Sequence, residues 1–311
     1  MTAAVGIEDE GFHAAGDDPH WLESAWFHLA VPERDLIGFV YFFHDVRTGT
    51  AGGGPAVWDP SGAEVYDCRF YDWRWLQPPT GPLDASDVQL PSGLRQRVLE
   101  PMAAYRITYD ALGLELDLEW RSIMAPHEIR YRSASTMIGA RHFDQPGRLT
   151  GSIVLDGERV PVDGFSLRDR SWGPHRPGAA RSGDYLWAIA DEREHWHAIT
   201  AARSSEHPGL DEVVNGYLVR DGELGELVTG ERRVVERRAG APVRVELDAE
   251  DEHGRALHAR GEVRSVLRWL GWPGRLTFWT LTDWRWDGHQ GWGEDQEFFP
   301  RDLAGAVIRA T

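Results

Sequence analysis

The 311-residue sequence predicts an all-β protein. Apolar and polar residues alternate with a period of two wherever a pattern is visible, and long segments of helical periodicity are absent. Gly, Pro and Asp separate the short hydrophobic runs, as is typical of a β-barrel or β-sandwich built from many short antiparallel strands. One closed barrel of this length would be large, so we expect two β units packed together, with few short helices.

Three segments of the N-terminal half carry its expected strands and turns. Residues 48–54 include three consecutive glycines and predict a loop tip. Residues 112–120 place leucines and a tryptophan on one face and acidic residues on the other, which predicts a half-buried strand. Asp156-Gly157 lies between the strand segments 151–155 and 158–162, and these residue types suit a type I′ hairpin turn.

The C-terminal half shows similar signals. Residues 185–189 and 243–247 alternate as strands do, and Asp221-Gly222 is a second hairpin signal. The clearest helix candidate is short and spans residues 303–308.

A Pro- and Gly-rich passage at residues 172–183 predicts the crossover between the two β units. We place the boundary after residue 176. The expected domains are therefore residues 1–176 and residues 177–311.

Composition excludes several function classes. The chain has 33 basic and 50 acidic residues, a formal charge of −17, which does not favour binding to nucleic acid or to an anionic membrane. Every basic residue is arginine, so lysine nucleophiles, Schiff bases and a P-loop lysine are excluded. Cys68 is the single cysteine, which excludes an internal disulfide. Because no apolar run approaches the length of a membrane span and residues 1–18 lack a signal pattern, we expect a cytoplasmic protein.

Aromatic residues are abundant, with 15 Trp, 11 Phe and 8 Tyr. Such a content indicates large buried surfaces, a pocket that recognises π systems, or both. Two clusters stand out, at residues 66–75, which includes Trp75, and at residues 278–286. Each is expected to form core or sheet face, with the alternative that one of them lines a ligand cavity.

The densest group of charges lies at residues 164–178, around Trp172. It contains Arg168, Asp169, Arg170, His175 and Arg176. We expect either a buried Arg-Asp network that holds the crossover or a functional site. An aspartate held between guanidinium groups stays ionised, so Asp169 is predicted to stabilise a cation rather than donate a proton.

A second candidate group comprises Asp184, Tyr185 and Trp187, together with His195 and His197 on one face of a strand. A histidine pair of this kind also occurs in metal sites, but no third ligand follows within three or four residues. We therefore expect no bound metal.

Several strings resemble one known superfamily. They are, in order, residues 23–27 (Glu-Ser-Ala-Trp-Phe), residues 90–94 (Leu-Pro-Ser-Gly-Leu), Glu100-Pro101, residues 141–151 (Arg-His-Phe-Asp-Gln-Pro-Gly-Arg-Leu-Thr-Gly) and residues 168–174 (Arg-Asp-Arg-Ser-Trp-Gly-Pro). In these the chain is similar, over most of its length, to the AttH-like and carotenoid-hydratase-like superfamily. The most specific string is Asp-Arg-Ser-Trp-Gly-Pro.

The resemblance implies two lipocalin-like β-barrel domains with a cavity at or near their junction. Relatives include hydratases of carotenoids and of prenylated phenolics, and cyclases of natural products. The resemblance therefore also implies acid–base chemistry without a cofactor. The His-x-Trp and Tyr-x-Asp pairs of the carotenoid hydratases do not match residue for residue, because residues 195–197 and 184–185 are similar only in composition. The chain also departs from the family pattern at residues 175–177.

Together these observations predict a cofactor-independent lyase or isomerase-type enzyme, with hydration or dehydration as the favoured reaction. The substrate class is a small hydrophobic molecule that is unsaturated, terpenoid-like or polycyclic. The candidate catalytic residues are Asp184, His197, Asp169 and His175, with Asp184 the better proton donor because Arg neighbours lower the pKa of Asp169. The candidate substrate-binding residues are Trp172, Tyr185, Trp187, Trp75, Arg170 and Glu294, whose aromatic members would stabilise a developing cation.

Two alternatives from other classes stay open. A noncatalytic lipocalin-like carrier of a hydrophobic metabolite would bind its ligand stoichiometrically and release no product. A carbohydrate-binding β protein would use exposed tryptophans. The sequence leaves the oligomeric state open, a homodimer included.

Overall fold

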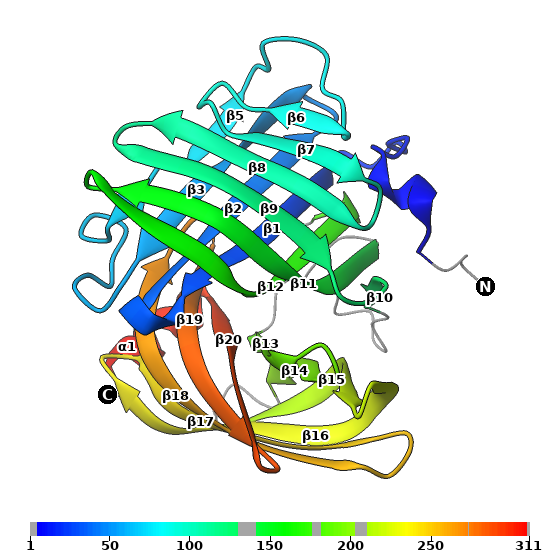
Figure 1. The fold of residues 1–311 in the computed structure, drawn as a ribbon, viewed down its shortest axis with the longest axis vertical. Coiled ribbons are helices and arrows are strands. Elements are labelled where there is room, and N and C mark those ends of the chain that lie inside the picture. Colours follow the sequence, from blue (N-terminus) through cyan, green and yellow to red (C-terminus); the bar gives the residue numbers. More distant parts are fainter. Residues whose placement is uncertain (1–4, 130–140, 176–181, 203–209, 273, 310–311) are drawn as a thin grey trace.

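The computed structural model describes residues 5–129, 141–175, 182–202, 210–272 and 274–309. It shows an all-β protein in which a large antiparallel sheet lies against a closed antiparallel barrel (Figure 1). The predicted all-β class is therefore confirmed. None of the described helices is long and apolar enough to cross a membrane.

The large sheet has 12 strands and remains open at its edges in the described residues. Its strands are β1 (Trp21–Val31), β2 (Leu36–Asp45), β3 (Thr50–Trp58), β4 (Phe70–Tyr71), β5 (Arg74–Gln77), β6 (Asp87–Gln89), β7 (Arg95–Glu100), β8 (Ala104–Ala111), β9 (Leu114–Ser122), β10 (His127–Glu128), β11 (Arg141–Leu155) and β12 (Glu158–Pro174). The order is β4-β3-β2-β1-β12-β11-β9-β8-β7-β6, with β5 paired to β3 and β10 paired to β11. The first strand of the sheet therefore pairs with its last, β12, which brings distant segments of the chain together.

The barrel closes because β13 pairs with β20 as well as with β14. Its strands are β13 (Gly183–Asp191), β14 (Glu194–Ala202), β15 (Leu210–Arg220), β16 (Glu223–Arg238), β17 (Ala241–Asp251), β18 (Ala256–Trp269), β19 (Arg275–Trp286) and β20 (His289–Pro300). Each strand pairs with the next along the chain. The remaining elements are the 3₁₀ helices η1 (Ile7–Glu10) and η2 (Pro32–Arg34) and the helix α1 (Arg301–Arg309), which contains the helix predicted at residues 303–308.

Alternation correctly predicts the strand at residues 112–120 except at its start. Leu116 and Leu118 are buried and Asp117 is exposed, as expected for a strand with one buried and one solvent-exposed face. Leu112 instead lies in the turn before β9, with φ 54° and an exposed side chain. Both residues of each predicted hairpin turn, at residues 156–157 and 221–222, have positive φ, as a type I′ turn requires.

The loop tip predicted at residues 48–54 is correct only for Thr48 and Gly49, because β3 begins at Thr50 and includes the three consecutive glycines. A Cβ on Gly54 would lie 1.7 Å from the carbonyl oxygen of Asp72, and one on Gly52 would lie 2.3 Å from the ring of Phe43. Gly54 also has φ +147°. The glycines are needed for the close approach of neighbouring strands and side chains, not for a turn.

The crossover predicted at residues 172–183 begins too early, because β12 runs on to Pro174. The predicted boundary after residue 176 lies outside the described residues and stays a prediction, as does the role of Arg176. The strands on either side of it, β12 and β13, belong to different sheets.

Three main apolar cores organise the molecule. One lies on the inner side of the large sheet, and a second fills the barrel interior. The third lies between the two, where Trp26 and Phe39 of the sheet meet Tyr185, Trp187 and Trp279 on the outer face of the barrel. The aromatic surplus therefore serves largely to join the two parts.

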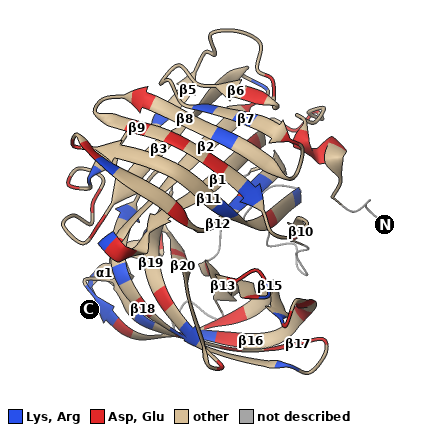
Figure 2. Ribbon diagram, in the orientation of Figure 1, with Lys and Arg blue, Asp and Glu red and all other residues tan. Residues whose placement is uncertain are grey.

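Acidic and basic residues are interspersed along the strands of both parts (Figure 2).

Candidate active site

A cavity of about 330 Å³ lies where the large sheet meets the outer face of the barrel. The sheet contributes residues of β1, β2, β5 and β12 to its lining, and the barrel contributes residues of β13, β18, β19 and β20. Exposed residues, among them His20 and Leu76, surround the mouth, whereas buried Tyr185, Trp279 and Gln296 form the deep end. A volume of this size suits a small organic ligand.

Strand β12 divides the charged motif between two faces. Asp169, Ser171 and His175 line the cavity, whereas Arg168 and Arg170 lie on the opposite face, in the inner side of the large sheet. Alternate residues of a strand point to opposite faces, so neighbours in the sequence are separated in space. The sequence could have shown this separation, because strand alternation over residues 168–175 places Asp169 on the opposite face from Arg168 and Arg170.

The expectation that flanking guanidinium groups keep Asp169 ionised is therefore wrong. The guanidinium of Arg168 lies 4.2 Å from the centre of the Tyr105 ring, and that of Arg170 lies 3.1 Å from the Glu23 carboxylate. Burial raises the pKa of Asp169 to about 7, and its Oδ1 atom has no hydrogen-bond partner. Asp169 is thus a half-buried carboxyl group that is partly protonated at neutral pH and faces the cavity.

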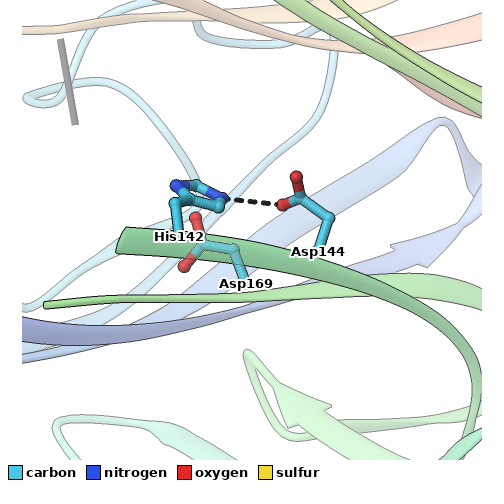
Figure 3. A group of neighbouring side chains, drawn as sticks. All are labelled: His142, Asp144 and Asp169. Atoms are coloured by element: carbon cyan, nitrogen blue, oxygen red, sulfur yellow. Dashed lines mark hydrogen bonds and ion pairs between the residues drawn. The ribbon is translucent and has the colours of Figure 1, made fainter. Parts of the chain in front are cut away.

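A titratable cluster continues from Asp169 into the protein (Figure 3). Polar atoms of His142, Asp144 and Asp169 all lie within 4.8 Å of one another, and Nε2 of His142 is 2.9 Å from Oδ1 of Asp144. Burial opposes charge on both His142 and Asp144, but their attraction outweighs it, so the pKa of His142 is raised and that of Asp144 is lowered. His142 and Asp144 therefore form a buried ion pair.

Tyr185 connects this cluster to the cavity. It lines the cavity, and its hydroxyl donates a hydrogen bond to Asp144. His197 lies behind it, with ring centres 4.6 Å apart and Nε2 3.7 Å from Oδ2 of Asp144. Burial lowers the pKa of His197 to about 4, so this imidazole is neutral at pH 7. His197 belongs to the cluster but does not line the cavity.

Asp184 lies elsewhere, inside the barrel. Its Oδ1 is 2.9 Å from Arg232, and Thr200 donates a hydrogen bond to its Oδ2. Burial and the neighbouring carboxylates raise the pKa of Asp184, against the opposing effect of Arg232. Because Asp184 and Tyr185 are successive residues of β13, only Tyr185 points toward the cavity. The preference for Asp184 over Asp169 as donor has no support in this geometry.

The other predicted binding residues fall into two groups. Trp75 lines the cavity, with 40% of its surface exposed at the mouth. Trp172 stacks on His13 with ring centres 4.3 Å apart, on the same side of the sheet as Arg170. Trp187 donates a hydrogen bond of 3.0 Å to Glu294 in the core between the two parts, where burial raises the pKa of Glu294 to about 8. Trp172, Arg170, Trp187 and Glu294 do not line the cavity.

His175 forms a polar chain on the cavity wall. Its Nδ1 donates to the carbonyl oxygen of Gly173 at 2.9 Å, so Nε2 is left as an acceptor for the Ser171 hydroxyl at 3.2 Å. Ser171 also lies 2.8 Å from the hydroxyl of Ser24. Burial lowers the pKa of His175 to about 4, so it remains neutral at pH 7.

Sequence reasoning missed several lining residues and two members of the cluster. They are Tyr41, Ser171, Trp269, Trp272, Arg275 and Gln296 in the lining, and His142 and Asp144 in the cluster. Trp279 belongs to the aromatic cluster at residues 278–286, for which a cavity lining was the alternative expectation. His142 and Asp144 lie within the family string at residues 141–151 and share a face, which is a usable signal. Ser171 lies within the family string at residues 168–174. The others come from β2, from β18 to β20 and from the segment between β18 and β19, and no local pattern connects them.

Two groups of described residues offer metal-ligand atoms, the His142 cluster and a barrel group of Asp184, Asp211 and Glu297. In the barrel group the guanidinium of Arg232 lies 3.1 Å from both Asp211 and Glu297 and so takes the place of a cation. In the His142 cluster, Oδ1 of Asp144 already accepts hydrogen bonds from His142 and Tyr185. Both arrangements suit internal ion pairs and proton transfer.

A family model described as a domain of unknown function, DUF7064, matches residues 6–295. The chain belongs to the DUF7064 family. No curated protein matches it in sequence.

Solved structures with the same architecture include a protein assigned as AttH from Nitrosomonas europaea, with a TM-score of 0.64 at 14% identity over 92% of this chain and 97% of that one. Kievitone hydratase from Nectria haematococca has a TM-score of 0.60 at 10% identity, over 95% and 93% of the two chains. CghA has a TM-score of 0.54 at 16% identity, over 91% and 89%. The resemblance of this DUF7064 chain to the AttH-like superfamily is thereby confirmed at the level of the fold.

Proposed function

We propose that this protein is an enzyme that adds water to, or removes water from, a small hydrophobic unsaturated molecule by proton transfer, without a cofactor. The observation that carries the proposal is the position of Asp169, a carboxyl group with a pKa of about 7 that faces an aromatic-lined cavity. A general acid is most effective when its pKa lies near the working pH. The fold shared with kievitone hydratase, which is named as a hydratase, supports the same reaction class.

The first step uses Asp169 as the acid. Its carboxyl proton is transferred to one carbon of the double bond, the π electrons form the new C–H bond, and a cation develops on the other carbon. Trp269, Trp279 and Tyr185 line the cavity, and their aromatic rings attract such a cation. A low-dielectric aromatic lining also keeps bulk water away from it.

The second step uses the cluster behind Tyr185. Water forms a C–O bond to the cation, and its surplus proton passes to Tyr185 as the Tyr185 hydroxyl proton moves to Asp144. The close approach of His142, Asp144 and Asp169 gives a route by which a proton returns to Asp169. The cycle then closes with water and alkene consumed and alcohol formed, and dehydration is its reverse.

Turnover in D2O tests the proposal. The wild-type protein would be incubated with unsaturated terpenoids and prenylated phenolics, and products would be examined by mass spectrometry for added water and for one carbon-bound deuterium. Asp169→Asn should lower the rate by about 10² to 10⁴-fold, whereas Asp163→Asn, an exposed site on the same strand, should not. Equal turnover by Asp169→Asn and wild type would overturn the proposal. Stoichiometric binding without product would favour a carrier instead.

A further inference from the structure

Gln296 places an amide group at the deep end of the cavity. It lies in β20, directly opposite Tyr185 of β13, and both residues line the cavity. Residues directly opposite each other on antiparallel strands have their Cβ atoms about 4.5 to 5.5 Å apart, and their side chains interact. The amide of Gln296 is therefore next to the residue whose hydroxyl donates a hydrogen bond to Asp144.

Glu294 holds this amide in one orientation. Its Oε2 atom accepts a hydrogen bond of 3.0 Å from the indole N–H of Trp187 and one of 2.9 Å from Nε2 of Gln296. An indole N–H can only donate, so Oε2 is an acceptor, and the amide N–H of Gln296 is the group that matches it. The carbonyl oxygen Oε1 of Gln296 is then directed away from Glu294.

This carbonyl oxygen is an acceptor that the cavity wall offers to a ligand. Gln296 is 8% exposed, and because it lies at the deep end, this exposure is to the cavity. Within the described residues its Oε1 atom accepts no hydrogen bond. A ligand that displaces solvent from such an oxygen without donating to it leaves a polar atom unpaired, which is unfavourable. The wall therefore favours a ligand that carries an O–H group.

We propose that Gln296 positions the water that adds to the substrate, together with Tyr185, and that Glu294 keeps Gln296 in the orientation that this requires. The inference rests on the proposed function and adds to it the residue that orients the nucleophile. One O–H of the water donates to the Gln296 carbonyl oxygen. The other donates to the Tyr185 hydroxyl oxygen, which can accept it while its own proton is donated to Asp144.

This arrangement accounts for both protons of the water. Because both O–H groups are held, a lone pair of the water oxygen is free to form the C–O bond to the cation. The proton on the Tyr185 side then leaves through Tyr185, and the O–H that remains still donates to Gln296. The alcohol product is therefore bound by the same carbonyl oxygen, whereas an ether of the same skeleton has no O–H to donate.

A matched pair of ligands tests this inference without the natural substrate. 2-Phenyl-2-propanol is a tertiary alcohol, and its methyl ether has the same skeleton without the O–H group. We expect calorimetric titration to show that Gln296→Leu weakens binding of the alcohol about five- to tenfold and changes binding of the ether less than twofold. Gln296→Met, which keeps the length of the side chain, should give the same result. Gln290→Leu removes an exposed glutamine from the other end of β20 and should change neither affinity.

Two variants of Glu294 test the orienting contact. Glu294→Leu removes the acceptor for Nε2 of Gln296 and should weaken binding of the alcohol about threefold or more, with little effect on the ether. Glu294→Gln keeps a carbonyl oxygen for the same two donors and should restore most of the affinity. Equal affinities of Glu294→Gln and Glu294→Leu for the alcohol would remove the orienting role of Glu294.

Three results would overturn the positioning role of Gln296. The first is that the wild type binds the ether as tightly as the alcohol. The second is that the Gln296 variants affect both ligands equally or neither, since a cavity-facing N–H group would serve the ether as well as the alcohol. The third is that Gln290→Leu reproduces the effect.

Product ratios add a measurement that a purely structural role would not change. With an alkene that the wild type hydrates, Gln296→Leu should release less alcohol and more isomerised alkene. Without a positioned water the cation returns a proton from a neighbouring carbon to the Asp169 carboxylate and leaves as the isomerised alkene. An unchanged ratio of alcohol to isomerised alkene would contradict the inference.

The binding measurements are independent of turnover. Selective loss of alcohol binding in Gln296→Leu, combined with full turnover by Asp169→Asn, would refute the proton-transfer chemistry and keep the hydroxyl site. Unchanged alcohol binding in Gln296→Leu, combined with an inactive Asp169→Asn, would do the opposite.

Discussion

Replacing Asp169 with Asn should stabilise the protein, and the gain should grow with pH. Burial raises the pKa of Asp169 from 3.8 to about 7, whereas the same group in the unfolded chain titrates normally. Between about pH 4 and pH 7 the native state therefore holds a proton that the unfolded chain has released, so this group makes wild-type stability fall as pH rises. Above about pH 7 the wild type bears the full free-energy cost of an ionised carboxylate at this site. The Asp169→Asn variant has no group that ionises there, so its stability does not carry this cost.

The size of the effect follows from the shift. About three pKa units at about 1.36 kcal/mol each give an upper limit of about 4 kcal/mol. Because Asp169 is only half-buried and faces the cavity, solvent screening reduces this cost, and we expect about 2 kcal/mol at pH 8.5 and little at pH 4.5. At about 2 to 4 °C per kcal/mol, the Tm of Asp169→Asn should exceed that of the wild type by about 4 to 8 °C at the higher pH.

Thermal unfolding followed by circular dichroism at the two pH values measures this difference. Asp163→Asn is the matched control, because Asp163 lies on the same strand with an exposed carboxylate 2.7 Å from Arg148. Its Tm should not rise at either pH. A gain for Asp169→Asn that is equal at both pH values, or one that Asp163→Asn reproduces, would refute the assignment of Asp169 as a half-buried acid with a raised pKa.

Four other outcomes are expected. The kcat/KM of the wild type should fall as pH rises through about 7, since Asp169 must hold its proton to act as the acid; a profile that is flat from pH 6 to pH 9 would exclude this role. Tyr185→Phe keeps the ring but removes the hydroxyl that donates to Asp144, so steady-state kinetics should show kcat about 10²-fold lower with KM little changed, and an unchanged kcat would remove Tyr185 from the relay. Arg232→Met leaves buried carboxylates unpaired and should lower the free energy of unfolding, measured in urea, by about 3 to 5 kcal/mol. An unchanged free energy of unfolding would contradict this prediction. Dialysis against EDTA should leave turnover and Tm unchanged, and restoration by an added metal would contradict a metal-free mechanism.

Local patterns predicted those parts of the fold that depend on neighbouring residues alone. The alternation in β9 and the Asp-Gly turns at residues 156–157 and 221–222 are properties of short segments, because side-chain direction and positive φ are set within a few residues. The error at residues 48–54 has the opposite cause. There the glycines serve a close approach by Asp72 and Phe43, contacts that a turn signature does not reveal.

The candidate site was only partly predictable for a related reason. Asp169, His175, Tyr185 and Trp75 were predicted and do line the cavity. The expected charge state of Asp169 was wrong because adjacency in sequence was taken for proximity in space, although a strand sends successive side chains to opposite faces.

By itself the sequence determined the all-β class, the hairpin turns, the supply of positive charge by arginine alone, and the family resemblance carried by the Asp-Arg-Ser-Trp-Gly-Pro string. Only the tertiary structure decided which groups meet in the cavity. Tyr185 of β13 and Trp279 of β19 line the same cavity as Asp169 of β12, and the pKa of Asp169 depends on its burial there. The reason is physical: turn geometry and side-chain alternation are local, whereas desolvation is a property of everything packed around a group.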